Sequence, residues 1–289
     1  MTAPTTGSLR VNGATLHYEV RGQGPLLLLV PGGAGGAAAF DGFVDDLAAD
    51  HTVATYDPRG ISRSTLDDPD AEQSVAEHAD DALRLLDLLS PGVPARVFGS
   101  SSGAIAAVQL LIDHPERIAR LVAHEPPLVE VLPDAAEHRA FVARVQETFH
   151  TQGLMPALAV FAEGLTKGGA ATEPKAELRL PPQAARRAER TMANLPYFVS
   201  RVVPRFMSHT PDTARLAELA DRLVLACGED SRGELAYRPA ALLAERLGTG
   251  LRHFPGGHTG STTHPAEFGA LLREVFATGP EAPGAQRAA

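Results

Sequence analysis

The sequence predicts an α/β fold in which helices cover both faces of a mostly parallel, doubly wound sheet. The main evidence is that short apolar runs, typical of buried strands, alternate with amphipathic helical patterns up to residue 127 and again after residue 219. In addition, a chain of 289 residues with 44% hydrophobic content can bury the core that such a sheet requires.

The first part of the chain reads as strands followed by helices. Residues 14–21 alternate like a half-buried strand, and they precede the apolar run Leu26–Val30 so closely that we expect the two to pair antiparallel. The next elements that we predict are a helix over 37–49, a strand over 52–56, a helix over 75–89, a strand ending near Phe98, a helix from Ser102 to about His114 and a strand over 118–123.

Beyond residue 127 the alternation stops. Residues 128–219 contain only helical patterns, including 137–148 and 155–165, joined by a linker over 168–182. We therefore expect a helical cap over 128–219, inserted after the strand over 118–123 into a core made of residues 1–127 and 220–278. In the second core segment we predict a strand over 223–227, a helix over 239–247, a strand over 251–254, a helix over 265–276 and a disordered tail over 279–289.

One pentapeptide organises the functional prediction: Gly99-Ser100-Ser101-Ser102-Gly103, between a predicted strand and a predicted helix. The spacing Gly-x-Ser-x-Gly is typical of a sharp strand-to-helix turn that exposes its central serine, and the glycines leave room where a Cβ would strike neighbouring backbone. Ser101 is therefore the candidate nucleophile. The alternative is a turn that merely caps the following helix.

A serine hydroxyl needs a base, an acid that orients the base, and amides that stabilise an oxyanion. His258 follows a strand in a glycine-rich loop and is the candidate base. Asp230 follows the preceding strand and is the candidate acid, while Glu229 and Glu125, also at strand ends, remain alternatives. The backbone amides of Gly33 and Ser102 are the expected oxyanion donors.

Composition argues against several other classes of protein. The formal charge of −9 and the lack of a basic cluster argue against nucleic-acid binding. A single cysteine, Cys227, cannot form an intramolecular disulfide or a cysteine-based zinc site. No signal-peptide or membrane-spanning pattern is present, so we expect a cytoplasmic protein. We expect no metal, and the expected partner is a small-molecule substrate. The oligomeric state is left open, a homodimer included.

The assembled pieces resemble the α/β-hydrolase superfamily over Leu9 to Phe276. Four segments carry the likeness: Pro31-Gly32-Gly33, residues 56–64, Gly99 to Gly103, and Gly256-Gly257-His258. The resemblance implies a capped hydrolase that cleaves esters, thioesters or lactones through an acyl-enzyme on Ser101, with no cofactor. The sequence departs from the family in two places. Pro31 stands where histidine is usual, and the family's acid position would fall on Ser231, so Asp230 is carried over with a shift of one residue.

The substrate is expected to be an apolar small molecule, because aromatic residues of residues 128–219 can line a pocket. These are Phe141, Phe149, Phe161, Tyr197, Phe198 and Phe206. Three alternatives remain: a serine-dependent carbon–carbon hydrolase or perhydrolase, a hydrolase-like binding protein without turnover, and an NAD(P)-dependent oxidoreductase. The last is suggested by the G-x-G-x-x-A spacing over 33–38 and by Asp57 as a ribose-binding acid.

Overall fold

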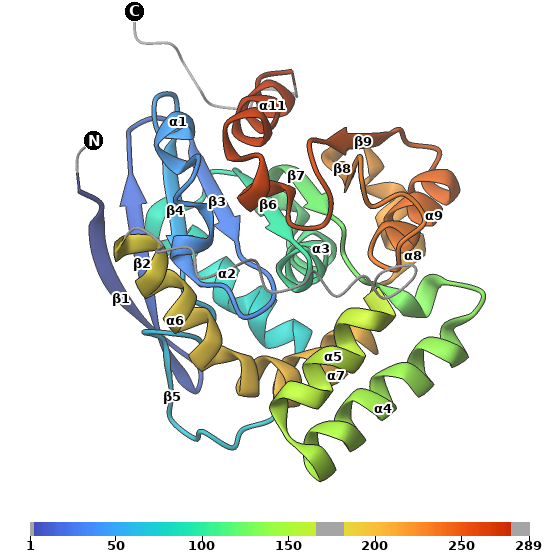
Figure 1. The fold of residues 1–289 in the computed structure, drawn as a ribbon. Helices are drawn as coiled ribbons and strands as arrows, with labels where there is room; N and C mark the ends of the chain where they lie inside the picture. Colours follow the sequence, from blue (N-terminus) through green and yellow to red (C-terminus); the bar gives the residue numbers. More distant parts are fainter. Residues whose placement is uncertain (1–2, 166–181, 279–289) are drawn as a thin grey trace, which may run out of the picture.

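A computed structural model describes residues 3–165 and 182–278 of the chain, with the backbone alone described at 182–184. Its strands form one twisted sheet in the order β1-β2-β4-β3-β6-β7-β8-β9, and the short β5 pairs with β2 (Figure 1). Pairing is parallel from β4 to β9 and antiparallel around β2. The strands are β1 Thr5–Val11, β2 Ala14–Arg21, β3 Leu26–Val30, β4 Thr52–Tyr56, β5 Thr65–Leu66, β6 Ala95–Ser100, β7 Ile118–His124, β8 Leu223–Gly228 and β9 Leu251–Phe254.

The antiparallel edge differs from the expectation. Strand β2 pairs with β4 and not with β3, because both edges of β3 are occupied by β4 and β6. The connection over 22–25 therefore leads past β4 instead of closing a hairpin. Strand β1 has no predicted counterpart, since most of its residues are exposed or half-buried and carry no apolar run.

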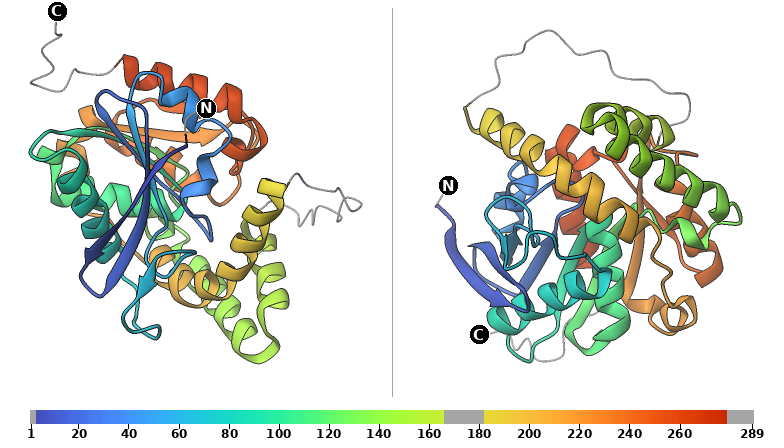
Figure 2. Two further views of the ribbon diagram at one scale, coloured as in Figure 1. Left: turned by 90° about the vertical axis from the view of Figure 1, so that its left-hand side faces the viewer. Right: turned by 90° about the horizontal axis from the view of Figure 1, so that it is seen from below.

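Helices cover both faces of the sheet, as expected. Helices α1 (Val44–Leu47) and α11 (Pro265–Ala277) pack on one face, and the left view of Figure 2 has both above the sheet. Helices α2 (Val75–Leu89), α3 (Ser102–Asp113) and α9 (Tyr237–Leu247) bury their apolar sides in the larger core on the other face. The shorter elements of the core are the helix α10 Gly260–Thr263 and the 3-10 turns η1 Ala37–Phe40, η2 Pro115–Arg117 and η5 Ala220–Arg222.

The helix expected over 37–49 is broken into η1 and α1. Gly42 lies between the two pieces, and a Cβ on it would come within 2.7 Å of Pro265 Cβ. At Gly42 the chain therefore approaches the start of α11 so closely that a residue without a Cβ is needed. The spacing of apolar residues does not reveal this approach, and for that reason it predicted one continuous helix.

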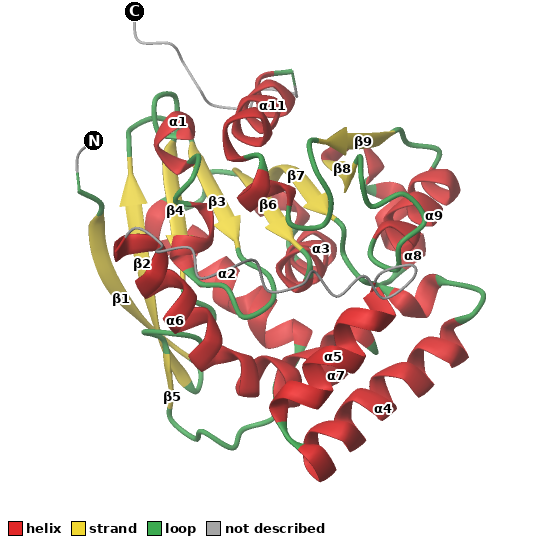
Figure 3. Ribbon diagram, viewed as in Figure 1, coloured by secondary structure: helices red, strands yellow, loops and turns green. Residues whose placement is uncertain are grey.

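The described residues between β7 and β8 contain helices and no strand (Figure 3). We call residues 128–219 the helical insertion. Its elements are η3 Val129–Val131, α4 Ala135–Gln152, α5 Leu154–Leu165, α6 Pro182–Tyr197, the π-helical turn η4 Phe198–Val202, α7 Val203–Met207 and α8 Thr213–Glu218. The expected linker, apart from Pro182, and the expected tail over 279–289 lie outside the described residues. No described helix is long and apolar enough to cross a membrane.

Candidate active site

Ser101 lies in a tight turn between β6 and α3. Its backbone has φ 55° and ψ −125°, a conformation that residues with a Cβ rarely adopt. A Cβ on Gly99 would lie 2.7 Å from Ala104 Cα, and one on Gly103 would lie 2.4 Å from the Pro31 carbonyl oxygen. The expected reason for both glycines is confirmed. The strained turn is held in place by backbone that leaves no room for larger residues.

His258 contacts two polar side chains at once. It lies in the loop after β9, and its Nε2 is 3.1 Å from Ser101 Oγ. Its Nδ1 is 2.6 Å from Oε2 of Glu125. Because the carboxylate accepts from Nδ1, the ring's Nε2 is left as the acceptor for the serine proton. Residues 101, 125 and 258 thus form one continuous chain of hydrogen bonds.

Glu125 follows β7 and is fully buried. It has φ 47°, so it shares with Ser101 the rare backbone region in which few residues other than glycine are found. Its Oε1 accepts the backbone N–H of Gly228 at 2.9 Å, which fixes the carboxylate between β7 and β8. Burial alone raises the pKa of Glu125, but its polar neighbours, His258 first among them, outweigh burial and hold the pKa below its ordinary value.

The carboxylate at His258 belongs to Glu125, and not to Asp230. Asp230 and Glu229 are both exposed, and their backbone amides pair with the carbonyls of Gly256 and Phe254. Ser231, the position where the family's acid would fall, is buried and carries no charge. The prediction of Asp230 as the acid is therefore wrong. Glu125, one of the two alternatives, makes the contact with His258 that was expected of Asp230.

The two expected oxyanion donors lie close to Ser101. Gly33 has φ 61°, and its N–H donates to Ser102 Oγ at 2.9 Å. Ser102 begins α3, so its own N–H is among the first four of the helix, which have no acceptor within the helix. The partial positive charge at this helix end favours an anion beside Ser101.

An apolar cavity of about 200 Å³ opens beside Ser101 and His258. Of the six aromatic residues that we expected there, Phe161, Phe198 and Phe206 line it. Three others do not: Phe141 stacks on Phe161 from behind, Phe149 faces His150, and Tyr197 packs against Gly60. The lining also includes residues that the sequence analysis missed, because aliphatic residues give no signal distinct from core: Pro127, Leu165, Val202, Val203, Met207 and Ala236.

A second cavity, of about 370 Å³, is also lined by Ser101 and His258. The glycine-rich loop over 32–36 and helix α6 form its walls, and polar side chains such as Ser62, Thr191 and Arg190 line it. The two cavities share Gly33, Ser101 and His258 as lining residues. A substrate whose two halves differ in polarity can thus place one half in each.

Asp57 lines the second cavity, but its carboxylate is already occupied. It accepts the Ala37 N–H at 2.8 Å and the Arg63 guanidinium at 2.7 Å. A ribose-binding role would need these oxygens to be available, so Asp57 does not fit the role of the ribose-binding acid that the dinucleotide interpretation requires. Among the described residues, no group of three or more His, Cys, Asp or Glu side chains is arranged to hold a metal ion.

Comparisons with known proteins identify the family and the fold. A family model described as alpha/beta hydrolase fold matches residues 25–166. An uncharacterised hydrolase of Bacillus subtilis (strain 168), YraK, is 37% identical over 277 residues, which cover 93% of this chain and 95% of that protein. A zearalenone hydrolase of Bionectria ochroleuca is 38% identical over 122 residues, 40% of this chain and 45% of the relative.

Solved structures share the fold at lower identity. Est816, described as an N-acyl homoserine lactone degrading enzyme, is 22% identical with a TM-score of 0.69, covering 93% of this chain and 99% of its own. An enol-lactonase of Burkholderia xenovorans LB400 is 18% identical with a TM-score of 0.67, covering 94% and 100%. At this level of identity the likeness concerns the fold.

Proposed function

This chain belongs to the α/β-hydrolase family, and on that premise we propose that it is a serine hydrolase that cleaves an ester, thioester or lactone of an apolar small molecule. The observation that carries the proposal is the hydrogen-bonded chain from Ser101 Oγ through His258 to Glu125, at the junction of two cavities. A binding protein without turnover needs neither these hydrogen bonds nor the strained turn nor a buried carboxylate.

In the proposed mechanism, Ser101 Oγ attacks the substrate carbonyl while His258 Nε2 takes the hydroxyl proton. Glu125 keeps the Nδ1 proton in place and stabilises the imidazolium that forms. The Gly33 and Ser102 amides stabilise the oxyanion, which requires the Gly33 N–H to exchange Ser102 Oγ for the substrate oxygen. His258 then gives its proton to the departing oxygen, or to the departing sulfur of a thioester.

Water completes the cycle. His258 removes a proton from a water molecule, the resulting hydroxide adds to the acyl carbon, and the Ser101 oxygen leaves with the proton that His258 returns. The products are a carboxylic acid and an alcohol or thiol, or a single hydroxy acid from a lactone. No step requires a redox group or an external co-reactant besides water.

The two cavities support a division of the substrate. We assign the acyl part to the apolar cavity and the leaving group to the larger, more polar one. A lactone, in which acyl part and leaving oxygen belong to one ring, would lie across the junction. The names of the zearalenone hydrolase and of the two lactone-cleaving structures are the reason to include lactones in the first substrate panel.

Labelling with a fluorophosphonate tests the proposal, because Ser101 Oγ would attack phosphorus and expel fluoride. We expect mass added to the peptide that contains Ser101, no labelling of Ser101→Ala, and slow labelling of His258→Ala. A folded wild-type protein that stays unlabelled, and that hydrolyses neither p-nitrophenyl esters nor lactones, would refute the proposal. Nicotinamide absorbance in the purified protein would instead favour the oxidoreductase alternative.

A further inference from the structure

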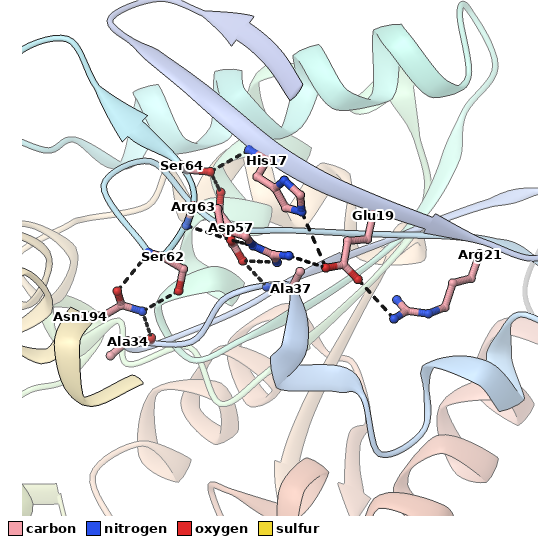
Figure 4. Close-up of polar contacts among 10 residues, drawn as sticks. All are labelled: His17, Glu19, Arg21, Ala34, Ala37, Asp57, Ser62, Arg63, Ser64 and Asn194. Carbon is pink, nitrogen blue, oxygen red and sulfur yellow. Dashed lines mark hydrogen bonds and ion pairs between the residues drawn. The ribbon is translucent and has the colours of Figure 1, made fainter. Parts of the chain in front are cut away.

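Asn194 of helix α6 connects the helical insertion to two loops of the core. Its side chain is 7% exposed and uses both polar atoms (Figure 4). Nδ2 donates to the Ala34 carbonyl at 2.9 Å and contacts Ser62 Oγ at 3.0 Å, and Oδ1 accepts the Ser62 N–H at 3.0 Å. Ala34 follows β3 and Ser62 follows β4, so one side chain spans both strand ends and the insertion.

Ser62 itself adopts an unusual conformation, with φ 52°. Among the described residues other than glycine, only Ser62, Ser101 and Glu125 have a positive φ, and the other two belong to the candidate active site. Such a conformation persists where the surroundings hold it, and here Asn194 contacts both the amide and the hydroxyl of Ser62. Two of the three strained residues thus belong to the candidate active site, and the third, Ser62, contacts the helical insertion through Asn194.

The Ala34 carbonyl matters because Gly33, the proposed oxyanion donor, is its chain neighbour. The loop that carries Gly33 is held by side chains at three places. Ser102 Oγ accepts the Gly33 N–H, Asp57 accepts the Ala37 N–H, and Asn194 donates to the Ala34 carbonyl. Only the third comes from outside the core.

Asp57 is in turn held by an ion-pair network within the core. Arg63 donates to Asp57 at 2.7 Å and to Glu19 of β2 at 2.8 Å, and Arg21 lies 3.2 Å from Glu19 (Figure 4). The side-chain contacts at the far end of the Gly33 loop therefore all come from the core. The side-chain contact with the Ala34 carbonyl comes from α6.

We propose that Asn194 is a positioning residue that sets the direction of the Gly33 amide, so that the packing of α6 against the core completes the oxyanion hole. The inference rests on the proposed function, because it concerns a donor that acts in the transition state. Once the Gly33 N–H leaves Ser102 Oγ for the substrate oxygen, the nearest side-chain restraint on the chain after Gly33 is the Asn194 contact with the Ala34 carbonyl, two peptide groups beyond the Gly33 N–H. An oxyanion donor stabilises the transition state more than the bound substrate, so misplacement lowers kcat more than it alters KM.

The test compares three variants by kcat and KM on p-nitrophenyl esters and by the rate of fluorophosphonate labelling. Asn194→Ala removes all three contacts. Asn194→Asp keeps an acceptor for the Ser62 N–H but places a carboxylate oxygen against the Ala34 carbonyl. Met192→Ala, at an exposed position of the same helix, is the matched control. Thermal unfolding of each variant identifies any that fail to fold.

We expect both Asn194 variants to lose about tenfold or more in kcat and in labelling rate, with KM changed by less than about threefold. Met192→Ala should match the wild type. Wild-type kcat in a folded Asn194→Ala, or a loss expressed in KM alone, would overturn the role of Asn194 while leaving the proposed function intact. An unlabelled and inactive wild type would overturn both. If Asn194→Ala does not fold, Asn194→Asp decides in the same way.

Discussion

At the scale of single residues, His258 is useful because each ring nitrogen meets a different chemical group. The Nδ1 contact with Glu125 fixes the tautomer, and the Nε2 contact with Ser101 then points an acceptor at the hydroxyl. Glu125 can remain ionised despite full burial because it receives both the His258 ring and the Gly228 N–H. The contact with His258, which lowers the pKa of Glu125, also makes this carboxylate an effective partner for an imidazolium.

Exchange of the carboxylate tests this assignment. Glu125→Gln keeps the size of the side chain but presents no charge to the imidazolium and can hold the wrong tautomer, so we expect kcat to fall by about 10³-fold to 10⁴-fold. Steady-state kinetics on a p-nitrophenyl ester measures the effect.

Asp230→Asn is the matched control for that experiment, because Asp230 is exposed and lies in the loop where an acid was first expected. Its kcat should stay within about twofold of wild type, as for surface substitutions in general. The reverse pattern, an inactive Asp230→Asn and an active Glu125→Gln, would contradict the geometry.

At the scale of elements, the candidate site depends on which strands are neighbours. Strands β6, β7 and β8 are parallel and adjacent, so Ser100, His124 and Ala226 lie side by side at one edge of the sheet. The residues that follow them are brought together for the same reason, which places Glu125 next to Ser101. The helices of the insertion then supply apolar side chains above this edge, with Phe161 of α5 and Phe198 of η4 in edge contact at 5.9 Å.

Phe161 offers a test of the apolar cavity at this scale. It lines the cavity and is half-buried, so Phe161→Ala enlarges the cavity without emptying the core. We expect kcat/KM to shift toward longer acyl chains, by about tenfold relative to the acetyl ester. A series of p-nitrophenyl esters from acetyl to dodecanoyl measures the shift.

Phe149→Ala is the control for the cavity, since Phe149 is also a half-buried aromatic residue of the insertion but faces His150 and not the cavity. Its chain-length preference should follow the wild type. An unchanged preference in Phe161→Ala, or an equal shift in both variants, would argue against the acyl part lying in this cavity.

At the scale of the whole molecule, stability and the site share one core. The larger apolar cluster continues from beneath the sheet edge into the helical insertion, including Val199 and Phe206. On the opposite face, His124 is buried next to Phe254 and Phe268, at ring distances of 5.9 Å and 5.3 Å. Burial lowers the pKa of His124 to about 4.

This buried histidine predicts a loss of stability in acid. Below pH 6.5 the unfolded chain protonates His124, whereas the folded protein does so only near pH 4. The free energy of unfolding should therefore fall by about 3 kcal/mol from this group as the pH drops from 6.5 to 4. Urea unfolding at several pH values measures the slope.

His124→Leu should reduce that slope, because leucine takes up no proton in either state. The substitution removes no hydrogen bond at Nε2, which has no partner among the described residues. Its backbone carbonyl, which accepts the Ser101 N–H, is retained. Equal slopes for wild type and His124→Leu would show that protonation of this group does not limit stability in acid.

Local sequence patterns predicted correctly those elements whose structure depends on residues close together in the sequence. The spacing from Gly99 to Gly103 predicted a tight turn because only glycine fits where a Cβ would meet backbone, and the apolar period of residues 75–89 matches α2 over its full length. Strand β1 was not predicted, because an exposed edge strand has little apolar signal. The partner of β2 was predicted wrongly, because strand order is not encoded in any one segment.

The sequence alone therefore determined the parallel sheet, the turn at Ser101 and a histidine after the last strand, since each follows from spacing within a few residues. Only the tertiary structure decided that Glu125 and not Asp230 meets His258, that half of the expected aromatics line the cavity, and that Asn194 contacts the loop of Gly33. These outcomes depend on strand order and on the direction in which loops leave the sheet. Such features are fixed by contacts between residues more than a hundred positions apart.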